Sequence, residues 1–215
     1  MEKGKNYPDR SVGSRDTLGS VRAKLREKHR MAREAMSMAE VMEKSEKICG
    51  WLLDAPWYAD CTVIYGYYPL RNEVDCRTFL DHALLDKKVV ALPKMTGKMS
   101  EYTENEGKAS KFMDFYQISS LKEVAPGKFH VMEPVAVCPR MEETHAIVLV
   151  PGVVFDRDGN RYGFGQGYYD RYFERFPRLY RVGIAYESQI EKTLWALPTD
   201  VRMNAICTEQ GILYF

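Results

Sequence analysis

Apolar and polar residues recur along this chain with two different periods, one typical of helices and the other of strands. Between residues 21 and 53 the apolar side chains return every three or four positions without an intervening proline, which predicts a helical region that breaks near Met36 and Ser37. The same spacing predicts helices over residues 74–85 and 168–176. Short apolar runs predict buried strands over residues 63–67, 89–92, 146–150, 181–185 and 205–207.

Strands that alternate with helices in this way are typical of an α/β fold. We expect three layers, a mostly parallel sheet with helices on both faces, formed by a single domain. That domain should cover residues 18–215 and follow a disordered polar tail over residues 1–17. The polar stretch 94–111 is expected to carry a hairpin. Because ligands gather at the carboxyl ends of the strands in such sheets, residues 68–73 and 163–167 are the expected ligand-binding segments.

The composition argues against several classes of protein. The 215 residues carry a net charge of +1, with 28% charged side chains, so we expect no nucleic-acid partner. No apolar run approaches the ~20 residues that a membrane span requires, and the polar start of the chain has no apolar signal-peptide core. These features predict a cytoplasmic protein without a membrane partner, which we expect to be a monomer or a weak dimer.

The cysteines and histidines show no metal-binding or disulfide pattern. The five cysteines, at positions 49, 61, 76, 138 and 207, are scattered and include no CxxC pair. This spacing argues against both a disulfide framework and a zinc site, so reduced and mostly buried thiols are expected. The four histidines share no metal-like spacing and are assigned no role.

The most informative segment is residues 151–171, PGVVFDRDGNRYGFGQGYYDR. Its glycines at positions 163, 165 and 167 remove every second side chain, so that backbone N–H groups can approach an anion closely, and a predicted helix begins directly after them. Asp170, beside such a loop, could coordinate a magnesium ion together with phosphate oxygens. Alternating glycines also occur in bulged strands and tight turns, and the spacing matches neither a Walker loop nor a Rossmann fingerprint.

Three arginines of the first predicted helix, Arg22, Arg26 and Arg33, project from roughly one face. Such a stripe can clamp phosphates, although arginines on a helix are more often solvated surface. Glu73 follows the first predicted strand and could accept two hydrogen bonds from an amino-pyrimidine ring, or it could cap the next helix. Asp200 precedes the last predicted strand and could be a second metal carboxylate or an ordinary turn residue.

Together these residues resemble the signature of the 5-formyltetrahydrofolate cyclo-ligases, also called methenyltetrahydrofolate synthetases. The resemblance rests on residues 151–171, on the helix that carries Arg22 and Arg26, on the NEVD segment at residues 72–75, and on DVRMN at residues 200–204. It spans about residues 20 to 211. It implies a ligase that uses ATP and Mg²⁺ to convert 5-formyltetrahydrofolate to 5,10-methenyltetrahydrofolate, releasing ADP and phosphate after phosphorylation of the formyl oxygen.

The resemblance also implies roles for individual residues. Catalytic roles fall to Arg161, Gln166 and Tyr168, and Mg²⁺ would be held by Asp170 and Asp200. The implied nucleotide-binding residues are Arg22, Arg26, Arg161, Tyr162, Gly163, Phe164, Gly165, Gln166, Gly167, Tyr168 and Tyr169. The implied folate-binding residues are Tyr68, Glu73, Phe129, Phe164, Gly165, Gln166, Gly167 and Tyr168.

The sequence departs from the family at position 166, where many relatives have lysine and this chain has Gln166. A neutral amide cannot replace a cation near phosphate charge, so the sequence alone predicts that Gln166→Lys raises turnover or ATP affinity. Two other functions remain open on the same scaffold, since one fold hosts many chemistries. One is a sugar-phosphate isomerase-like enzyme, and the other is a non-catalytic protein that binds folate and nucleotide.

Overall fold

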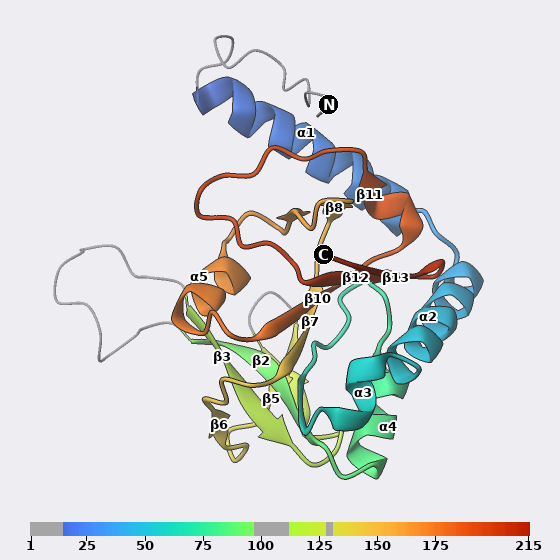
Figure 1. Ribbon diagram of the computed structural model, residues 1–215, viewed down its shortest axis with the longest axis vertical. Coiled ribbons are helices and arrows are strands. Elements are labelled where there is room, and N and C mark those ends of the chain that lie inside the picture. Colours follow the sequence, from blue (N-terminus) through green and yellow to red (C-terminus); the bar gives the residue numbers. More distant parts are fainter. Residues whose placement is uncertain (1–14, 97–111, 128–130) are drawn as a thin grey trace, which may run out of the picture.

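The structure, a computed structural model, describes residues 15–96, 112–127 and 131–215 (Figure 1). Its largest element is an eight-stranded sheet with the strand order β13-β12-β10-β7-β1-β2-β3-β6. The five central strands, β12 (Ala205–Thr208), β10 (Tyr180–Ile184), β7 (Ile147–Pro151), β1 (Val63–Tyr65) and β2 (Val89–Thr96), are parallel to one another. The strands β13 (Gly211–Tyr214), β3 (Phe112–Ile118) and β6 (Arg140–Met141) are antiparallel. The expected mostly parallel sheet is confirmed.

Helices cover both faces of this sheet, as expected. Adjacent residues of a strand point to opposite faces, so Ile64 packs with the helices α2 (Met38–Leu53), α3 (Pro56–Asp60) and α4 (Arg77–Leu85), whereas Tyr65 packs with α5 (Tyr168–Arg175). Figure 1 shows α2, α3 and α4 together on one side of the sheet and α5 on the other. Two buried clusters of apolar side chains therefore fix the positions of the helices.

The predicted break in the first helical region lies where it was expected. Helix α1 spans Arg15–Glu34, and α2 begins at Met38 after Ser37. The Ser37 side chain accepts a hydrogen bond from the Glu40 amide, and the Glu40 carboxylate accepts one from the Ser37 amide, so the two residues form a capping box. Residues 1–14, most of the expected polar tail, lie outside the described part of the chain.

Helix α4 begins at Arg77, three residues later than the sequence predicts. The intervening segment is instead a turn, in which the Glu73 amide donates to the Leu70 carbonyl over 3.1 Å. The Leu70 amide in turn donates to Glu73 Oε2 over 3.0 Å. Glu73 therefore closes the turn and does not cap the helix.

Strands β2 and β3 pair in antiparallel fashion on either side of the segment where the sequence predicts a hairpin. The register pairs Val90 with Ile118 and Thr96 with Phe112. Residues 97–111 between these strands lie outside the described residues. The strands β4 (Val124–Pro126) and β5 (Met132–Pro134) also pair in antiparallel fashion.

A smaller sheet supports helix α1. It has the order β11-β8-β9 and consists of β11 (Ile190–Glu191), β8 (Val154–Asp156) and β9 (Arg161–Tyr162). Val153, Val154, Tyr162 and Leu194 form a buried apolar cluster there, and Leu25 of α1 packs on it. This contact holds one face of α1 against the segment that carries the glycine loop.

The chain order of the large sheet reverses between β1 and β7. The chain passes from β1 to β2 and β3 on one side, then returns to β7 beside β1 and continues to β10 and β12 on the other. Crevices form at the carboxyl ends of strands at such a reversal, and they are common ligand sites. Tyr68 and Glu73 follow β1, and the glycine loop follows β7, so the predicted site segments lie at this position.

Two further expectations concern cysteines and membranes. All five cysteines are free, and four of them are buried, as predicted. In the described part of the chain, none of the helices combines the length and the apolarity that crossing a membrane requires.

Candidate functional site

A cavity of about 1050 Å³ lies between α1, the segment after β1 and the loop between β9 and α5. Pockets for one drug-sized ligand occupy roughly 300–1000 Å³, so this hollow has room for more than one small molecule. Most of the residues that the sequence nominated line it, namely Arg22, Arg26, Tyr68, Glu73, Arg161, Gly163, Phe164, Gly165, Gln166, Gly167, Tyr168, Tyr169, Asp170 and Asp200. Phe129 lies outside the described residues. Tyr162 is described and does not line the cavity.

The glycine loop connects β9 to α5. The helix directly after the loop was predicted, and the short strand β9 before it was not. Gly165 and Gly167 adopt φ angles of 85° and 66°, in the left-handed region that a side chain disfavours. Gly167 is also the N-cap residue of α5, where the first helical amides have no acceptor within the helix. The loop therefore presents main-chain donors and the positive end of a helix dipole to the cavity, an arrangement that favours an anion.

The three arginines of α1 that the sequence nominated, Arg22, Arg26 and Arg33, are buried or half-buried and are not solvated surface. Arg22 is only 7% exposed and contacts Asp200, with Nη1 2.9 Å from Oδ2 and Nη2 donating to Oδ1 over 3.2 Å. Arg26 donates from Nε to the Gly163 carbonyl over 2.8 Å. The pKa of Arg26 is lower than that of an ordinary arginine. Burial is the main cause, and repulsion from the Arg22 charge is the next largest. A cation that its surroundings destabilise gains more from a bound phosphate, so Arg26 is well placed to attract one.

The aromatic ring of Tyr162 packs against the guanidinium groups of Arg22 and Arg26. Its ring centroid lies 4.3 Å from the Arg22 guanidinium carbon and 5.4 Å from that of Arg26, within the range of a cation–π contact. The Tyr162 hydroxyl donates to the Trp195 carbonyl and accepts from the Trp195 amide, both over 2.9 Å. The buried ring thus orients the guanidiniums, and this role differs from the direct nucleotide contact that the resemblance implied.

Two carboxylates lie at the same end of the cavity. Arg161 Nη2 donates to both Asp170 oxygens over 3.3 and 3.2 Å, and the Val201 amide donates to Asp170 Oδ1 over 3.3 Å. The contacts of Asp200 are shorter. The Leu197 amide donates to Asp200 Oδ2 over 2.7 Å, and Arg22 Nη1 lies 2.9 Å from the same oxygen. The Val201 bond brings the segments of the two aspartates together.

These two carboxylates could bind a magnesium ion only if a nucleotide supplies further ligands. Among the described residues, no three His, Cys, Asp or Glu side chains gather as a metal cluster. Mg²⁺ commonly takes one or two carboxylates and completes its octahedron with water and phosphate oxygens. The donor set is therefore compatible with an ion brought by a nucleotide. Asp170 has the longer and weaker contacts, so it is the carboxylate that such an ion would more easily free from its present partners.

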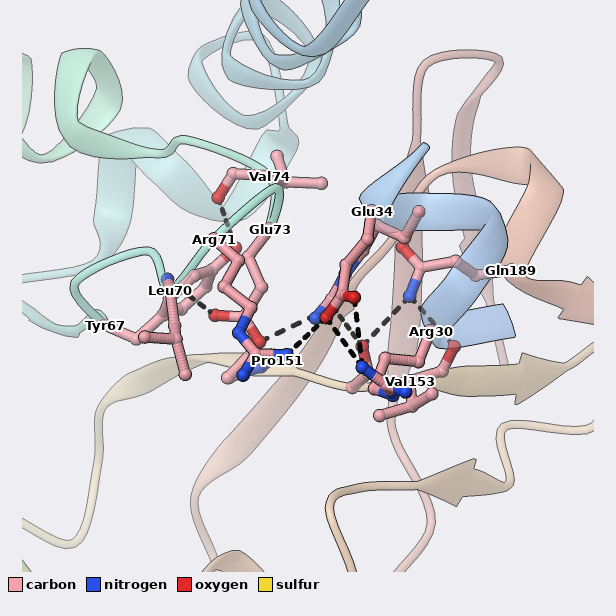
Figure 2. A network of polar contacts seen from close by, with 12 residues as sticks. Arg30, Glu34, Tyr67, Leu70, Arg71, Glu73, Val74, Pro151, Val153 and Gln189 are labelled. Atoms are coloured by element: carbon pink, nitrogen blue, oxygen red, sulfur yellow. Dashed lines mark hydrogen bonds and ion pairs between the residues drawn. The ribbon is translucent and has the colours of Figure 1, made fainter. Parts of the chain in front are cut away.

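The opposite end of the cavity is built around Glu73. This side chain is buried, and Oε1 lies 3.5 Å from Arg33 Nη1 without a hydrogen-bond partner. Burial raises the pKa of Glu73, and the nearby positive charge of Arg33 opposes that rise. The bond from the Leu70 amide occupies Oε2 (Figure 2). Oε1 is thus a buried acceptor that a ligand N–H group could satisfy.

Arg33 itself is 2% exposed, and it donates from Nη1 to the Gly152 carbonyl over 3.2 Å. Its guanidinium carbon lies 5.8 Å from the Phe164 ring centroid. Buried charges are costly unless they are paired, so Arg33 and Glu73 depend on each other. Helix α1 therefore contributes Arg22 and Arg26 to the lining of the cavity, and its Arg33 lies behind the lining residue Glu73.

A second ion-pair group lies at the rim near Glu73. Figure 2 shows Arg30 and Arg71 both directed at Glu34. Arg30 Nη1 donates to the Glu34 oxygens over 3.1 and 3.0 Å, and Arg71 Nη1 contacts Glu34 Oε1. Arg71 has a φ of 54°, which is unusual outside glycine. Both arginines line the cavity.

Aromatic rings lie between the two ends. Phe164 is 48% exposed at the wall of the cavity, and Tyr168 is half-buried in the same wall. The Tyr68 hydroxyl accepts a hydrogen bond from Arg77 over 3.2 Å, which fixes that ring. Tyr169 is half-buried like Tyr168, and burial raises the pKa of its phenol. Flat apolar surfaces of this kind suit a ring system flanked by charged groups.

Sequence reasoning did not assign several lining residues. Arg30 lies four positions after Arg26, and this helical spacing could have identified it. Arg71 belongs to the turn before Glu73 and had no distinguishing signal. The apolar residues come from distant segments that only the fold brings together, and they include Pro93, Met95, Met113 and Leu197.

Comparisons with known proteins agree on one family. A family model described as the 5-formyltetrahydrofolate cyclo-ligase family matches residues 19–209. A mitochondrial 5-formyltetrahydrofolate cyclo-ligase of Arabidopsis thaliana is 24% identical over 92% of this chain and 77% of its own length. A 5-formyltetrahydrofolate cyclo-ligase of Mus musculus is 23% identical over 91% of this chain and 97% of its own length.

Solved structures show the same likeness in three dimensions. The NMR structure of the 5,10-methenyltetrahydrofolate synthetase of Aquifex aeolicus superposes with a TM-score of 0.74 at 29% identity, covering 90% of this chain and 92% of that one. The 5,10-methenyltetrahydrofolate synthetase of Mycoplasma pneumoniae superposes with a TM-score of 0.65 at 25% identity, covering 87% and 98%. The resemblance drawn from the motifs is confirmed.

Proposed function

This chain belongs to the 5-formyltetrahydrofolate cyclo-ligase family, and on that premise we propose that it converts 5-formyltetrahydrofolate to 5,10-methenyltetrahydrofolate with consumption of ATP. The observation that carries the proposal is the single cavity of about 1050 Å³ with two unlike ends. One end has arginines and the glycine loop, which suit phosphates. The other has the buried Glu73 acceptor, which suits the N–H groups of a pterin.

The reaction requires the two substrates to lie side by side. The formyl oxygen on N5 attacks the γ-phosphorus of ATP, and the bond from that phosphorus to the β-phosphate bridging oxygen breaks, releasing ADP. N10 then attacks the activated formyl carbon and gives up its proton, and the carbon–oxygen bond breaks to release phosphate, which takes up that proton. No strong base is needed, so the protein contributes mainly positioning and charge stabilisation.

The described residues fit these tasks. Arg26 and Arg161 are placed to bind the phosphates, and the loop amides around Gly165 are placed to share their charge. Glu73 would orient the pterin through Oε1. Phe164 and Tyr168 lie between the two ends, where they would hold the pterin face and exclude water from the transferred phosphoryl group.

Asp170 and Asp200 would hold Mg²⁺ together with the phosphates of ATP. When bound, the ion would neutralise phosphate charge during transfer. Removal of the ion by a chelator should therefore weaken nucleotide binding as well as turnover. Equilibrium binding of ATP with and without the chelator measures the first effect without an activity assay.

The direct test mixes the protein with Mg-ATP and 5-formyltetrahydrofolate and follows the methenyl chromophore together with ADP. Equal amounts of methenyl product and ADP support the proposal. Binding of both ligands without product would instead indicate a non-catalytic binding protein. Turnover of a sugar phosphate without nucleotide would indicate the isomerase-like alternative. The chain's Glu73→Gln variant provides the matched control, since it should retain ATP binding and lose folate affinity.

We also propose a cytoplasmic location, a monomer or weak dimer, and no nucleic-acid partner. The near-neutral net charge supports the last point. The relative in Arabidopsis thaliana is named as mitochondrial, so the location of this protein needs a test of its own. Cell fractionation and light scattering of the purified protein test the location and the oligomeric state.

A further inference from the structure

The glycines of the loop do more than expose amides, because arginine side chains pack against the positions where side chains are missing. A methyl group added at Gly163 would lie 2.7 Å from Arg161 Nη1, closer than non-bonded atoms approach. One added at Gly165 would lie 3.7 Å from the guanidinium carbon of Arg26, in van der Waals contact. Two of the three alternating glycines thus each adjoin one guanidinium that the proposed function assigns to phosphate.

The third glycine, Gly167, also lies against an arginine, Arg171, to which the proposed function assigns no role. A methyl group at Gly167 would lie 2.8 Å from Arg171 Nη1. Arg171 Nη2 donates to the Gln166 carbonyl over 2.7 Å, and its guanidinium carbon lies 5.6 Å from the Tyr168 ring centroid. Arg171 also lines the cavity. It belongs to the first turn of α5, and its side chain returns along the helix toward the loop.

We infer that Arg171 is a phosphate-binding residue of this enzyme and supplies the positive charge at the loop that Gln166 does not. The inference rests on the proposed function and extends it. The bond to Gln166 uses the main-chain carbonyl, so it holds the guanidinium beside residue 166 whatever that side chain is. Arg26, Arg161 and Arg171 then form three cations along one loop, each against its own glycine. A guanidinium presents several donors in one plane, which suits the oxygens of a triphosphate.

This arrangement changes the expectation for position 166. The sequence alone predicts that Gln166→Lys raises turnover or affinity, because the loop then lacks a cation. With Arg171 in place, a lysine adds a second positive charge where one is already present, and Gln166→Lys should change kcat/KM for ATP by less than about threefold. Without Arg171 the lysine should become useful, so the two positions should compensate for each other.

Four variants test this: Arg171→Ala, Gln166→Lys, the double variant, and Arg178→Ala. Arg178 is an exposed arginine beyond the end of α5 and outside the cavity, so it controls for loss of one surface charge. Arg171→Ala should lower kcat/KM for ATP about 10- to 100-fold, the effect of losing one charge-assisted hydrogen bond. The double variant should recover at least about fivefold of that loss, and Arg178→Ala should match the parent.

Equilibrium binding separates this inference from the proposed reaction. Mg-ATP, and inorganic triphosphate as a probe without the nucleoside, should both bind Arg171→Ala more weakly than the parent, with unchanged thermal unfolding. If the parent makes no methenyl product, the proposed reaction fails, and these binding constants still test Arg171. Parent-like triphosphate binding by Arg171→Ala would overturn the inference. A double variant as impaired as Arg171→Ala alone would overturn the compensation between the two positions.

Discussion

Replacement of Arg33 by methionine tests how the folate end of the cavity is held together. Arg33 Nη1 lies 3.5 Å from Glu73 Oε1, and both side chains are buried. At an effective dielectric constant of about 20, opposite charges at that separation attract by about 5 kcal/mol. Measurements on other buried pairs that lose one partner give about 3–5 kcal/mol. We therefore expect Arg33→Met to lower the free energy of unfolding by about 3–5 kcal/mol near pH 8.

The size of this loss should depend on pH. Burial already raises the pKa of Glu73 above its ordinary value of 4.5, and removal of the Arg33 charge raises it further. Between the ordinary value and the raised value, the folded protein keeps a proton that the unfolded chain has released. Stability then falls as pH rises, by up to about 1.4 kcal/mol per pH unit. The deficit of Arg33→Met should therefore be smaller at pH 5 than at pH 8.

Urea denaturation at both pH values, on five proteins, measures the coupling. These are the parent, Arg33→Met, Glu73→Gln and the double variant, with Lys24→Met as an exposed cation-to-methionine control on the same helix. The control should change stability by no more than about 0.5 kcal/mol. The double variant should be more stable than the sum of the single losses predicts, and the stability difference between it and Glu73→Gln should not change with pH, because neither protein carries the Glu73 carboxyl group. Additive losses, together with a pH-independent deficit in Arg33→Met, would refute the coupling of the two charges.

Two further predictions concern the phosphate end. Asp170→Asn should lower turnover at least about 100-fold and should destabilise the fold less than Asp200→Asn does, because the contacts of Asp170 with Arg161 are longer than the 2.9 Å contact of Asp200 with the buried Arg22; equal stabilities of the two variants would contradict this difference. Gly163→Ala should lower kcat/KM for ATP about tenfold while the free energy of unfolding changes by less than about 1 kcal/mol, because the new methyl group meets only the movable end of the Arg161 side chain; parent-like kinetics would remove Arg161 from the phosphate site.

Local patterns were sufficient to predict the elements that carry the site. The helix break at Ser37 has a capping sequence, and the central strands are apolar runs long enough to be recognised. The order of strands and helices then placed the segments after β1 and β7 at the carboxyl edge of a parallel sheet. This is why Glu73 and the glycine loop could be assigned to one cavity from the sequence.

The remaining features depend on contacts between segments distant in sequence. The start of α4 shifts to Arg77 because Glu73 closes the preceding turn, and nothing in the helical spacing indicates that bond. The edge strand β13 was not predicted, because its pairing with β12 stabilises only four residues. The contact of the Tyr162 ring with the Arg22 guanidinium could not be predicted either. The position of that ring beneath Arg22 follows from the packing of α1 on the small sheet.

The ion pairs at the phosphate end explain how the cavity can keep buried arginines before any substrate arrives. An unpaired guanidinium in this setting would be costly, and Asp200 and Asp170 remove that cost by pairing with Arg22 and Arg161. A triphosphate offers the same arginines more oxygens and more charge than one carboxylate does. Under the proposed function, its binding would exchange one set of partners for another, and the aspartate oxygens would become available as ligands for a cation. Arginine and aspartate would then both be required at this end, because each would keep the other in place until the nucleotide binds.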